Sequence, residues 1–342
     1  MPGSAADRAV KQSRIRRVLE ESAAEALVLT SHEAVSWYLE GIRSHVSLAG
    51  PPVAAVRVDA EGDTIFVAAN EADRLIAEEL LPEDAALVRR VPWITPPAEA
   101  AGPALGEASV APGLRAARAS LLPAERERYR ALGRDAAEAM TDVASSLTPP
   151  STERQAAAAL AGALVERGID PLVILAAGTS RLGHRHPLPT DAPLGRRAML
   201  VVCGRRHGLI ANLTRWVGDD ADDAILDVEA TFFAASRPGA RLDEVFEAGT
   251  AAYSTAGFDP DEWQRHHQGG PTGYAGRDPR ATPATTDLVQ EHQAFAWNPS
   301  APGVKVEDTV LVSSAGVEVL TLDPRWPTTV RAGLTRPAAR PY

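Results

Sequence analysis

The chain has 342 residues, of which 45% are hydrophobic and 23% charged, a balance typical of a globular protein long enough for two domains. Its net charge of −10 argues against a general nucleic-acid binder, because phosphate recognition needs a positive field. No apolar run approaches the roughly 20 residues of a membrane span, and residues 1–17 lack the apolar segment of a secretory signal. The one cysteine, Cys203, excludes an internal disulfide and a cysteine-based metal cluster. These features predict a cytoplasmic protein.

The first part of the chain alternates between helical and extended patterns. An amphipathic helix is expected from residues 14–19 onward, and the apolar residues 26–30 predict a buried strand. Residues 52–58 and 63–67 have the pattern of two paired strands with a tight turn between them. Residues 71–79 return to a helical pattern. Together these elements predict a small α/β domain.

A segment rich in proline, alanine and glycine follows at residues 94–121, which is typical of a connection between domains. Beyond it, Pro123 stands in the expected first turn of a long amphipathic helix that ends near Pro149. Ser151-Thr152-Glu153 offers a cap for a second helix, which runs up to Gly168. We therefore expect two consecutive helices at the start of a second domain.

The rest of the chain is expected to be mostly extended. Two helices are predicted between residues 220 and 257, with a break at Pro238 and Gly239. The predicted strands lie at residues 172–176, 198–203, 209–217, 294–297, 304–312 and 317–322. Helices that precede strands favour an α+β domain. The predicted fold is thus α/β followed by α+β, with an N-terminal domain and linker at residues 1–118 and a second domain at residues 119–342.

Short motifs occur in a characteristic order along both domains. In the second domain they are Leu122-Pro123-Ala124-Glu125-Arg126, Thr152-Glu153, His186-Pro187-Leu188-Pro189-Thr190, Leu213-Thr214-Arg215, Arg237-Pro238-Gly239 and Gly303-Val304-Lys305-Val306-Glu307-Asp308-Thr309. In the first domain, Thr30-Ser31-His32 and Trp37-Tyr38-Leu39-Glu40-Gly41 belong to the same series. Each motif is weak alone, but their order and spacing resemble those of the creatinase/aminopeptidase P/prolidase family, also called the pita-bread family.

The resemblance implies a fold and an assembly. It implies a small creatinase-like α/β domain followed by a pita-bread domain, and a small-molecule or short-peptide substrate. It also implies a homodimer in which residues 37–45 of one subunit approach the pocket of the other, with Arg43 and His45 as candidate contacts. Neither nucleic acid nor a membrane is expected as a partner.

The metal ligands of the family are largely missing from the matching positions. Metal-dependent members hold two divalent ions with two aspartates, one histidine and two glutamates. The second aspartate position is Asn212 here, the histidine falls on Gly270, and one glutamate is Asn298. The first aspartate falls within residues 201–203, which hold no carboxylate, so only Glu307 remains. Because such cations need converging charged oxygen and imidazole ligands, we expect no metal and no other cofactor.

His186 is the candidate acid and base. Creatinase-like members cleave a C–N bond without metal, and the resemblance places their catalytic histidine at His186. An imidazole titrates near pH ~6.5, so it can take up a proton and return it within one turnover. The supporting carboxylates of creatinase would lie at Thr214 and Asn298, so creatine is not the expected substrate. We hypothesise a metal-independent hydrolase, or a related C–N-bond enzyme, with Glu307 beside His186 as an electrostatic partner or a water orienter.

The remaining candidate residues predict how the substrate is bound. Arg277 can clamp a carboxylate with two hydrogen bonds, and amide side chains can both donate and accept them. Lys305 stands two residues before Glu307 and is expected on the same face of one strand. We predict a small substrate that carries a carboxylate or an amide. The candidate substrate contacts are His266, Asn212, Thr214, Asn298, Arg277 and Lys305.

Several alternatives stay open. Glu307 can equally be a buried carboxylate that Lys305 or a neighbouring arginine satisfies. His267 is expected to face solvent beside His266. At the level of function, the alternatives are a non-catalytic module that binds peptides or other ligands, and an Xaa-Pro-type metallopeptidase.

Overall fold

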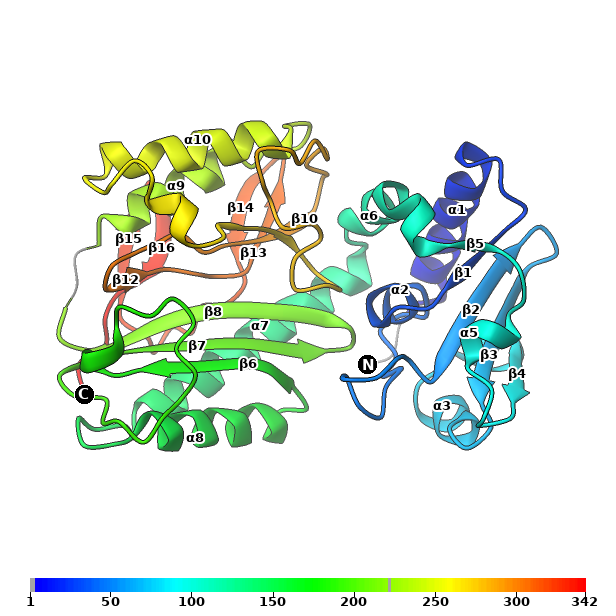
Figure 1. Ribbon diagram of the computed structural model, residues 1–342, viewed down its shortest axis with the longest axis horizontal. Coiled ribbons are helices and arrows are strands. Elements are labelled where there is room, and N and C mark those ends of the chain that lie inside the picture. The colour runs from blue at the N-terminus through cyan, green and yellow to red at the C-terminus, as the bar shows by residue number, and fades with distance from the viewer. Residues whose placement is uncertain (1–3, 221–222) are drawn as a thin grey trace. The chain divides into compact units, whose positions relative to one another are not determined.

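The computed structural model describes residues 4–220 and 223–342. Their contacts divide the chain into two compact units, both drawn in Figure 1. Unit 1 comprises Met1–Arg126 and His207–Leu209, and unit 2 comprises Glu127–Arg206 and Ile210–Tyr342. Within residues 4–220 and 223–342, no helix is both long enough and apolar enough to span a bilayer.

Unit 1 is built on a five-stranded mixed sheet in the order β4-β3-β2-β1-β5. The strands are β1 (Ala26–Leu29), β2 (Ala54–Asp59), β3 (Asp63–Ala68), β4 (Val88–Val91) and β5 (Leu105–Gly106). β1, β2 and β3 pair antiparallel, while β4 and β5 join the edges in parallel. All four residues of β1 are buried, which is the burial that its continuous apolar pattern predicts.

Helices surround this sheet. They are α1 (Ala5–Glu21), α2 (His32–Tyr38), α3 (Ala72–Glu78), α4 (Pro82–Ala85), α5 (Pro97–Ala100) and α6 (Ala111–Ala119), with the short 3₁₀ turn η1 (Glu107–Val110). α1 begins earlier than its amphipathic pattern indicates, because Ser4 caps it by accepting a hydrogen bond from the backbone of Asp7. The expected α/β character of this first region is confirmed.

Residues 94–121 are more ordered than their composition indicates. They contain α5, β5 and α6, and β5 pairs with β1 inside the sheet. Leu114 and Ala117 of α6 are buried. The segment expected to connect the domains therefore belongs to unit 1, where apolar side chains spaced along it give it a face to bury.

Unit 2 contains two main sheets. The strands of the first, in the order β6-β7-β8, are β6 (Asp170–Ala177), β7 (Arg197–Arg206) and β8 (Leu209–Gly218). The second has the order β14-β13-β10-β9, and its strands are β9 (Gly269–Thr272), β10 (Gln293–Trp297), β13 (Val310–Ser313) and β14 (Gly316–Val319). Two hairpins complete the unit, namely β11 (Ser300–Ala301) with β12 (Val304–Lys305), and β15 (Thr328–Arg331) with β16 (Leu334–Pro337).

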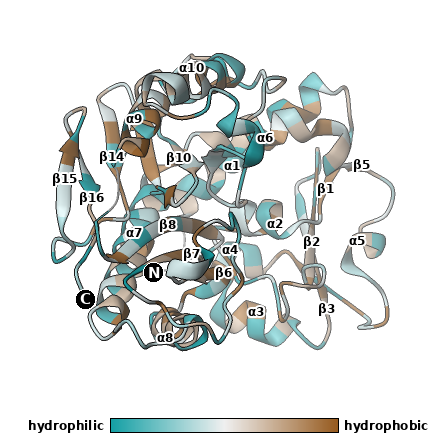
Figure 2. Cartoon of the chain, turned by 60° about the vertical axis from the view of Figure 1, so that its left-hand side comes forward, coloured by the Kyte–Doolittle hydropathy of each residue, from teal (hydrophilic) through white to brown (hydrophobic). Residues whose placement is uncertain are grey.

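Two pairs of helices cover these sheets on opposite sides of unit 2, as Figure 1 shows. They are α7 (Pro123–Ala144) with α8 (Glu153–Glu166), and α9 (Ile225–Ala235) with α10 (Leu242–Thr255); two 3₁₀ turns, η2 (Thr179–Arg181) and η3 (Glu262–Arg265), lie in the connections. Within the cap predicted at residues 151–153, Thr152 caps α8 in a reciprocal capping box with Gln155. Figure 2 shows hydrophobic residues along the strands and mixed faces on the helices. The pair between residues 220 and 257 is confirmed, although residues 221–222 lie outside the described part.

The segment expected as one strand at residues 304–312 is interrupted. β12 ends at Lys305 and β13 begins at Val310, so Glu307 lies outside any strand. The prediction that Lys305 and Glu307 share a strand face is therefore wrong in its premise. At the break, the chain forms an isolated antiparallel bridge to β8, in which Asp308 is opposite Leu213 and the backbone N–H of Thr214 donates to the carbonyl of Glu307.

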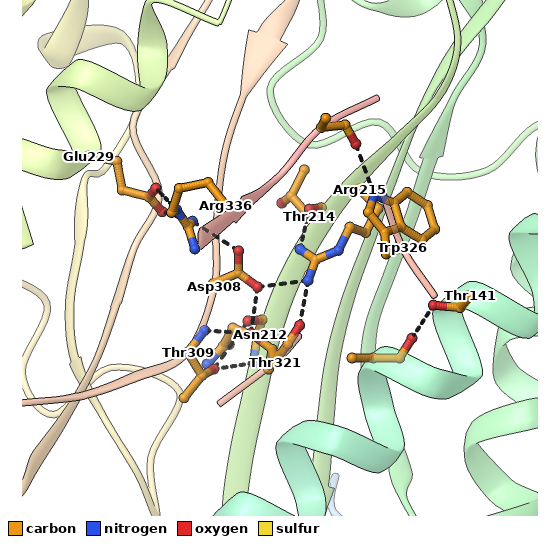
Figure 3. A network of polar contacts seen from close by, with 12 residues as sticks. Thr141, Asn212, Thr214, Arg215, Glu229, Asp308, Thr309, Thr321, Trp326 and Arg336 are labelled. Carbon is orange, nitrogen blue, oxygen red and sulfur yellow. Dashed lines mark hydrogen bonds and ion pairs between the residues drawn. The ribbon is translucent and has the colours of Figure 1, made fainter. Parts of the chain in front are cut away.

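Those surroundings form a buried polar network, which Figure 3 shows from close by. Asp308 lies between the guanidinium groups of Arg215 and Arg336, with closest N–O distances of 2.9 Å to each. Arg336 also donates two hydrogen bonds to Glu229, at 2.7 and 2.6 Å. Every side chain of this network is at most 2% exposed. The network fixes the segment that also carries the preceding residue, Glu307.

Candidate functional site

A cavity of about 440 Å³ in unit 2 gathers most of the predicted site residues. Its polar lining consists of His186, Asn212, His267, Arg277, Arg280, Asn298, Lys305 and Glu307. Its apolar lining comes from β6, β7, β8 and nearby positions, namely Leu172, Val173, Leu175, Val201, Cys203 and Ile210. Alternate residues of β7 and β8 reach the same cavity because successive side chains of a strand point to opposite faces.

Glu307 is the one carboxylate among the described residues that line this cavity. Nη2 of Arg277 donates to its Oε1 at 2.6 Å, and Nζ of Lys305 lies 3.7 Å from its Oε2. The Glu307 side chain is 2% exposed and that of Arg277 is 13% exposed. The carboxylate is therefore held by two cations from within its own unit.

Two amide side chains complete the polar wall. Asn212 on β8 is buried; its Oδ1 accepts a hydrogen bond of 3.4 Å from Nη1 of Arg277, and its Nδ2 donates to Thr272. Asn298, which follows β10, is also buried, but its Oδ1 has no hydrogen-bond partner in the described part of the chain. Arg277 thus bridges Asn212 and Glu307, while Asn298 keeps an acceptor for a ligand.

Three histidines form a cluster at one side of the cavity. Nε2 of His186 lies 3.1 Å from Nε2 of His266, and Nδ1 of His266 lies 3.1 Å from Oγ of Ser300. The ring of His267 stacks against that of His186, with ring centres 5.6 Å apart. His186 and His267 line the cavity, whereas His266 is outside the lining and is 7% exposed. The cluster therefore links the cavity to the buried hydroxyl of Ser300.

All three imidazoles are held in the neutral form. Burial lowers the pKa of His266 to about 2 and that of His267 to about 3, and nearby cations add to both effects. Desolvation followed by the charge of Lys305 lowers the pKa of His186, while Glu307 opposes this shift. Neutral imidazoles can accept protons, which is the state that a general base requires.

These histidines are also the residues whose spacing would allow a shared metal ion. One ring nitrogen from each lies within 4.8 Å of the others. The local charge opposes a cation there, because Lys305 lowers the pKa of all three imidazoles and therefore raises the energy of any added positive charge.

Two residues named from the sequence lie elsewhere or are chemically inactive. Thr214 lines a second cavity of about 310 Å³ rather than the cavity of His186, although its backbone N–H donates to the carbonyl of Glu307. Its prediction as a substrate contact in this cavity is therefore wrong. Burial raises the pKa of Cys203 to about 12, so its thiol stays protonated at neutral pH.

Three residues of the site were missed or misplaced by sequence reasoning. His267 was expected to face solvent, but it lines the cavity and its Nδ1 has no hydrogen-bond partner among the described groups. Arg280 lines the same cavity, and Ser300 anchors His266. The sequence signals are positional: His267 is adjacent to the candidate His266, and Ser300 lies two residues after the candidate Asn298.

Comparison with known proteins places the fold. Residues 127–314 match the model of the family described as metallopeptidase family M24. None of the curated proteins matches this chain in sequence.

Solved structures give the same result over the whole chain. A prolidase from Pyrococcus horikoshii OT3 is similar with a TM-score of 0.73 and 17% identity, over 92% of this chain and 99% of that one. The dipeptidase PepE from Mycobacterium ulcerans gives a TM-score of 0.74 and 19% identity, over 100% of both chains. The N-terminal domain of the FACT complex subunit SPT16 from chickpea (Cicer arietinum) gives a TM-score of 0.67 and 12% identity, over 92% of this chain and 97% of that one. These likenesses confirm the predicted creatinase-like and pita-bread architecture.

Proposed function

Because this chain belongs to metallopeptidase family M24, we propose that it is a hydrolase of a C–N bond that works without the family's pair of metal ions, with His186 as the general acid and base. The observation that carries the proposal is the ion pair of Arg277 with Glu307. It puts a guanidinium against the one carboxylate of the cavity lining in the described chain, next to three neutral imidazoles.

The donor set of the cavity does not fit two divalent cations. Hard cations of that kind need several carboxylate oxygens. The lining supplies Glu307 alone among the described residues, together with the amides of Asn212 and Asn298. Arg277 contacts both Asn212 and Glu307, so it competes with a metal for the oxygens that are present. No step of the proposed reaction therefore passes through a metal.

The histidine cluster supplies the proton-transfer chemistry. If His266 donates from Nδ1 to Oγ of Ser300, its Nε2 accepts from Nε2–H of His186. Nδ1 of His186 then carries the free lone pair. In this tautomer, His266 also stabilises the protonated form of His186, because an imidazolium donates a stronger hydrogen bond than a neutral ring.

The reaction is an ordinary hydrolysis. His186 accepts a proton from water as the water oxygen bonds to the carbonyl carbon of the substrate. Nε of Arg277, a buried donor with no acceptor in the described chain, is suited to the charge that develops on the carbonyl oxygen. The C–N bond then breaks, and His186 returns the proton to the leaving nitrogen, which yields a carboxylic acid and an amine.

A matched pair of histidine variants tests this role. His186→Gln removes the acid and base, and we expect it to abolish release of amine from an N-acyl amino acid. General acid–base catalysis contributes about 10²- to 10⁴-fold. His184→Gln, two residues earlier at an exposed position, is the control and should leave the rate unchanged. Equal rates for both variants would contradict the proposal.

A second function remains supported by one comparison. The chickpea SPT16 domain has the same fold and is described as a subunit of a complex rather than as a peptidase. A non-catalytic ligand-binding module would bind the same small molecules but release no amine, and His186→Gln would leave binding intact. The absence of turnover with every bound ligand would favour this function.

The family resemblance also supports a homodimer, with Arg43 and His45 near the pocket of the partner. Light scattering gives the mass of the assembly in solution. Arg43→Ala should weaken ligand binding if the partner contributes, and a monomeric mass would contradict the dimer.

A further inference from the structure

The charge balance of the cavity points to the chemical class of its ligand. Three cationic side chains, Arg277, Arg280 and Lys305, line it beside the single carboxylate of Glu307. The neighbouring imidazoles are neutral. The lining described here therefore carries a net charge of about +2, although the whole chain carries −10. Such a local reversal of sign is selective for an anion.

Arg280 is the cation that an incoming anion would meet without competition. Glu307 is already engaged by Arg277 and lies near Lys305. Arg280 is exposed, and its side chain has no hydrogen bond or ion pair with another described residue. A carboxylate on the ligand would supply the missing partner, and a guanidinium binds it with two parallel hydrogen bonds.

The same charges disfavour a free α-ammonium group. An ammonium needs a carboxylate or several carbonyl oxygens, and the only carboxylate of the described lining is paired with two cations. Bringing a further positive charge beside Arg277, Arg280 and Lys305 would be repulsive. A peptide with a free amino terminus is therefore a poor fit.

Two buried polar atoms without hydrogen-bond partners indicate which other groups the ligand carries. Oδ1 of Asn298 is an acceptor without a donor, which an amide N–H would satisfy. Nε of Arg277 is a donor without an acceptor, which a carbonyl oxygen would satisfy. Leu172, Val173 and Val201 give the cavity an apolar wall, and its volume of about 440 Å³ suits a small molecule.

We propose that this site binds N-acylated amino acids, with the ligand carboxylate at Arg280 and Lys305, its amide between Asn298 and Arg277, and its apolar side chain on the wall formed by Leu172, Val173 and Val201. The site excludes dipeptides that carry a free α-ammonium. This inference rests on the proposed hydrolase for its biological meaning, but it concerns binding and can be tested without turnover.

Two ligands that differ in one group test the inference. N-acetylleucine and glycylleucine share a carboxylate, an amide and an isobutyl side chain, and they differ in a methyl hydrogen replaced by an ammonium. Calorimetry with full-length His186→Gln protein measures their affinities without hydrolysis. We expect N-acetylleucine to bind at least tenfold more tightly, and its affinity to fall with added salt. Equal or tighter binding of glycylleucine would overturn the inference.

A pair of arginine variants locates the carboxylate. Arg280→Gln, made in the same background, should weaken binding of N-acetylleucine about tenfold. Arg241→Gln is the control, because Arg241 pairs with Asp243 and does not line this cavity. N-acetylleucinamide, which lacks the carboxylate, should bind as weakly to the parent as N-acetylleucine binds to Arg280→Gln. Unchanged affinity in Arg280→Gln would overturn the placement.

The two proposals fail in different ways. If the protein binds N-acetylleucine selectively but the unmodified protein releases no leucine from it, this inference is supported and the proposed hydrolase activity is contradicted. If the protein releases leucine from glycylleucine in preference to N-acetylleucine, this inference is overturned, while the proposed hydrolase activity is supported.

Discussion

Glu307 and Asp308 are adjacent in the chain, yet Asp308 lies in a closed buried network of charges and Glu307 lies at a cavity. Asp308 lies between Arg215 and Arg336, and all three side chains are at most 2% exposed. Glu307 also has two cations nearby, but the Arg277 side chain is 13% exposed and lines a cavity. A closed network of charges fixes a structure, whereas an open one leaves polar atoms for a ligand.

The largest expected effect concerns the closed network. Asp308→Asn removes the charge between Arg215 and Arg336, so that Arg215 loses its carboxylate partner and Arg336 keeps Glu229 alone. Breaking a buried pair in this way costs about 3–5 kcal/mol. Urea denaturation should show a large drop in the unfolding midpoint, and a change below about 1 kcal/mol would contradict the structural role of Asp308.

The matched substitution at the cavity is Glu307→Gln. Arg277 and Lys305 then lose their carboxylate, but cavity water can solvate them, so the free energy of unfolding should fall by only about 1 kcal/mol. The pKa of His186 should drop further, because Glu307 opposes its lowering. Both denaturation and the pH profile of activity check this. A loss of stability as large as that of Asp308→Asn would show that Glu307 is structural.

The histidine cluster predicts a stability that depends on pH. The folded pKa values of His266 and His267, about 2 and 3, lie below the ordinary value of 6.5. The unfolded chain therefore binds more protons between those values, and the folded state loses stability as pH falls below about 6.5. Each group contributes at most about 1.4 kcal/mol per pH unit. His266→Gln should flatten the dependence between neutral pH and pH ~5, and an unchanged slope would contradict the assignment.

The smallest expected effect is that of Ser300→Ala. The substitution removes the hydroxyl oxygen that faces Nδ1 of His266. The hydrogen bond lost with it contributes about 1 kcal/mol to stability. Nitrogen NMR of the imidazoles reports their tautomers directly. We expect the fraction of His186 protonated at Nε2 to fall and the rate to fall several-fold, while Ser300→Thr preserves both. An unchanged tautomer would exclude Ser300 as a positioning residue.

The sequence predicted the architecture because its signals are local. The apolar run of β1, the paired pattern of β2 and β3, and the capping box at Thr152 each specify an element within a few residues. Residues 94–121 were expected to connect the domains because of their Pro and Gly content. That content is a weaker signal of structure than the spacing of the buried residues Leu114 and Ala117.

The site was less accessible from sequence, because its decisive contacts join residues far apart in the chain. Arg277 and Glu307 were both named, but nothing local indicates that they pair with each other. Thr214 illustrates the reverse case, since it belongs to a recognisable motif while its side chain lines another cavity. Charge balance across a cavity appears only when the fold brings its walls together.

The most direct test of the central claim measures hydrolysis and metal content on the same sample. After exhaustive chelation, the protein should still release leucine from N-acetylleucine while elemental analysis finds far less than one metal ion per chain. His186→Gln should abolish that release. Loss of activity on chelation, with recovery on addition of manganese, cobalt or zinc, would contradict metal-independent hydrolysis.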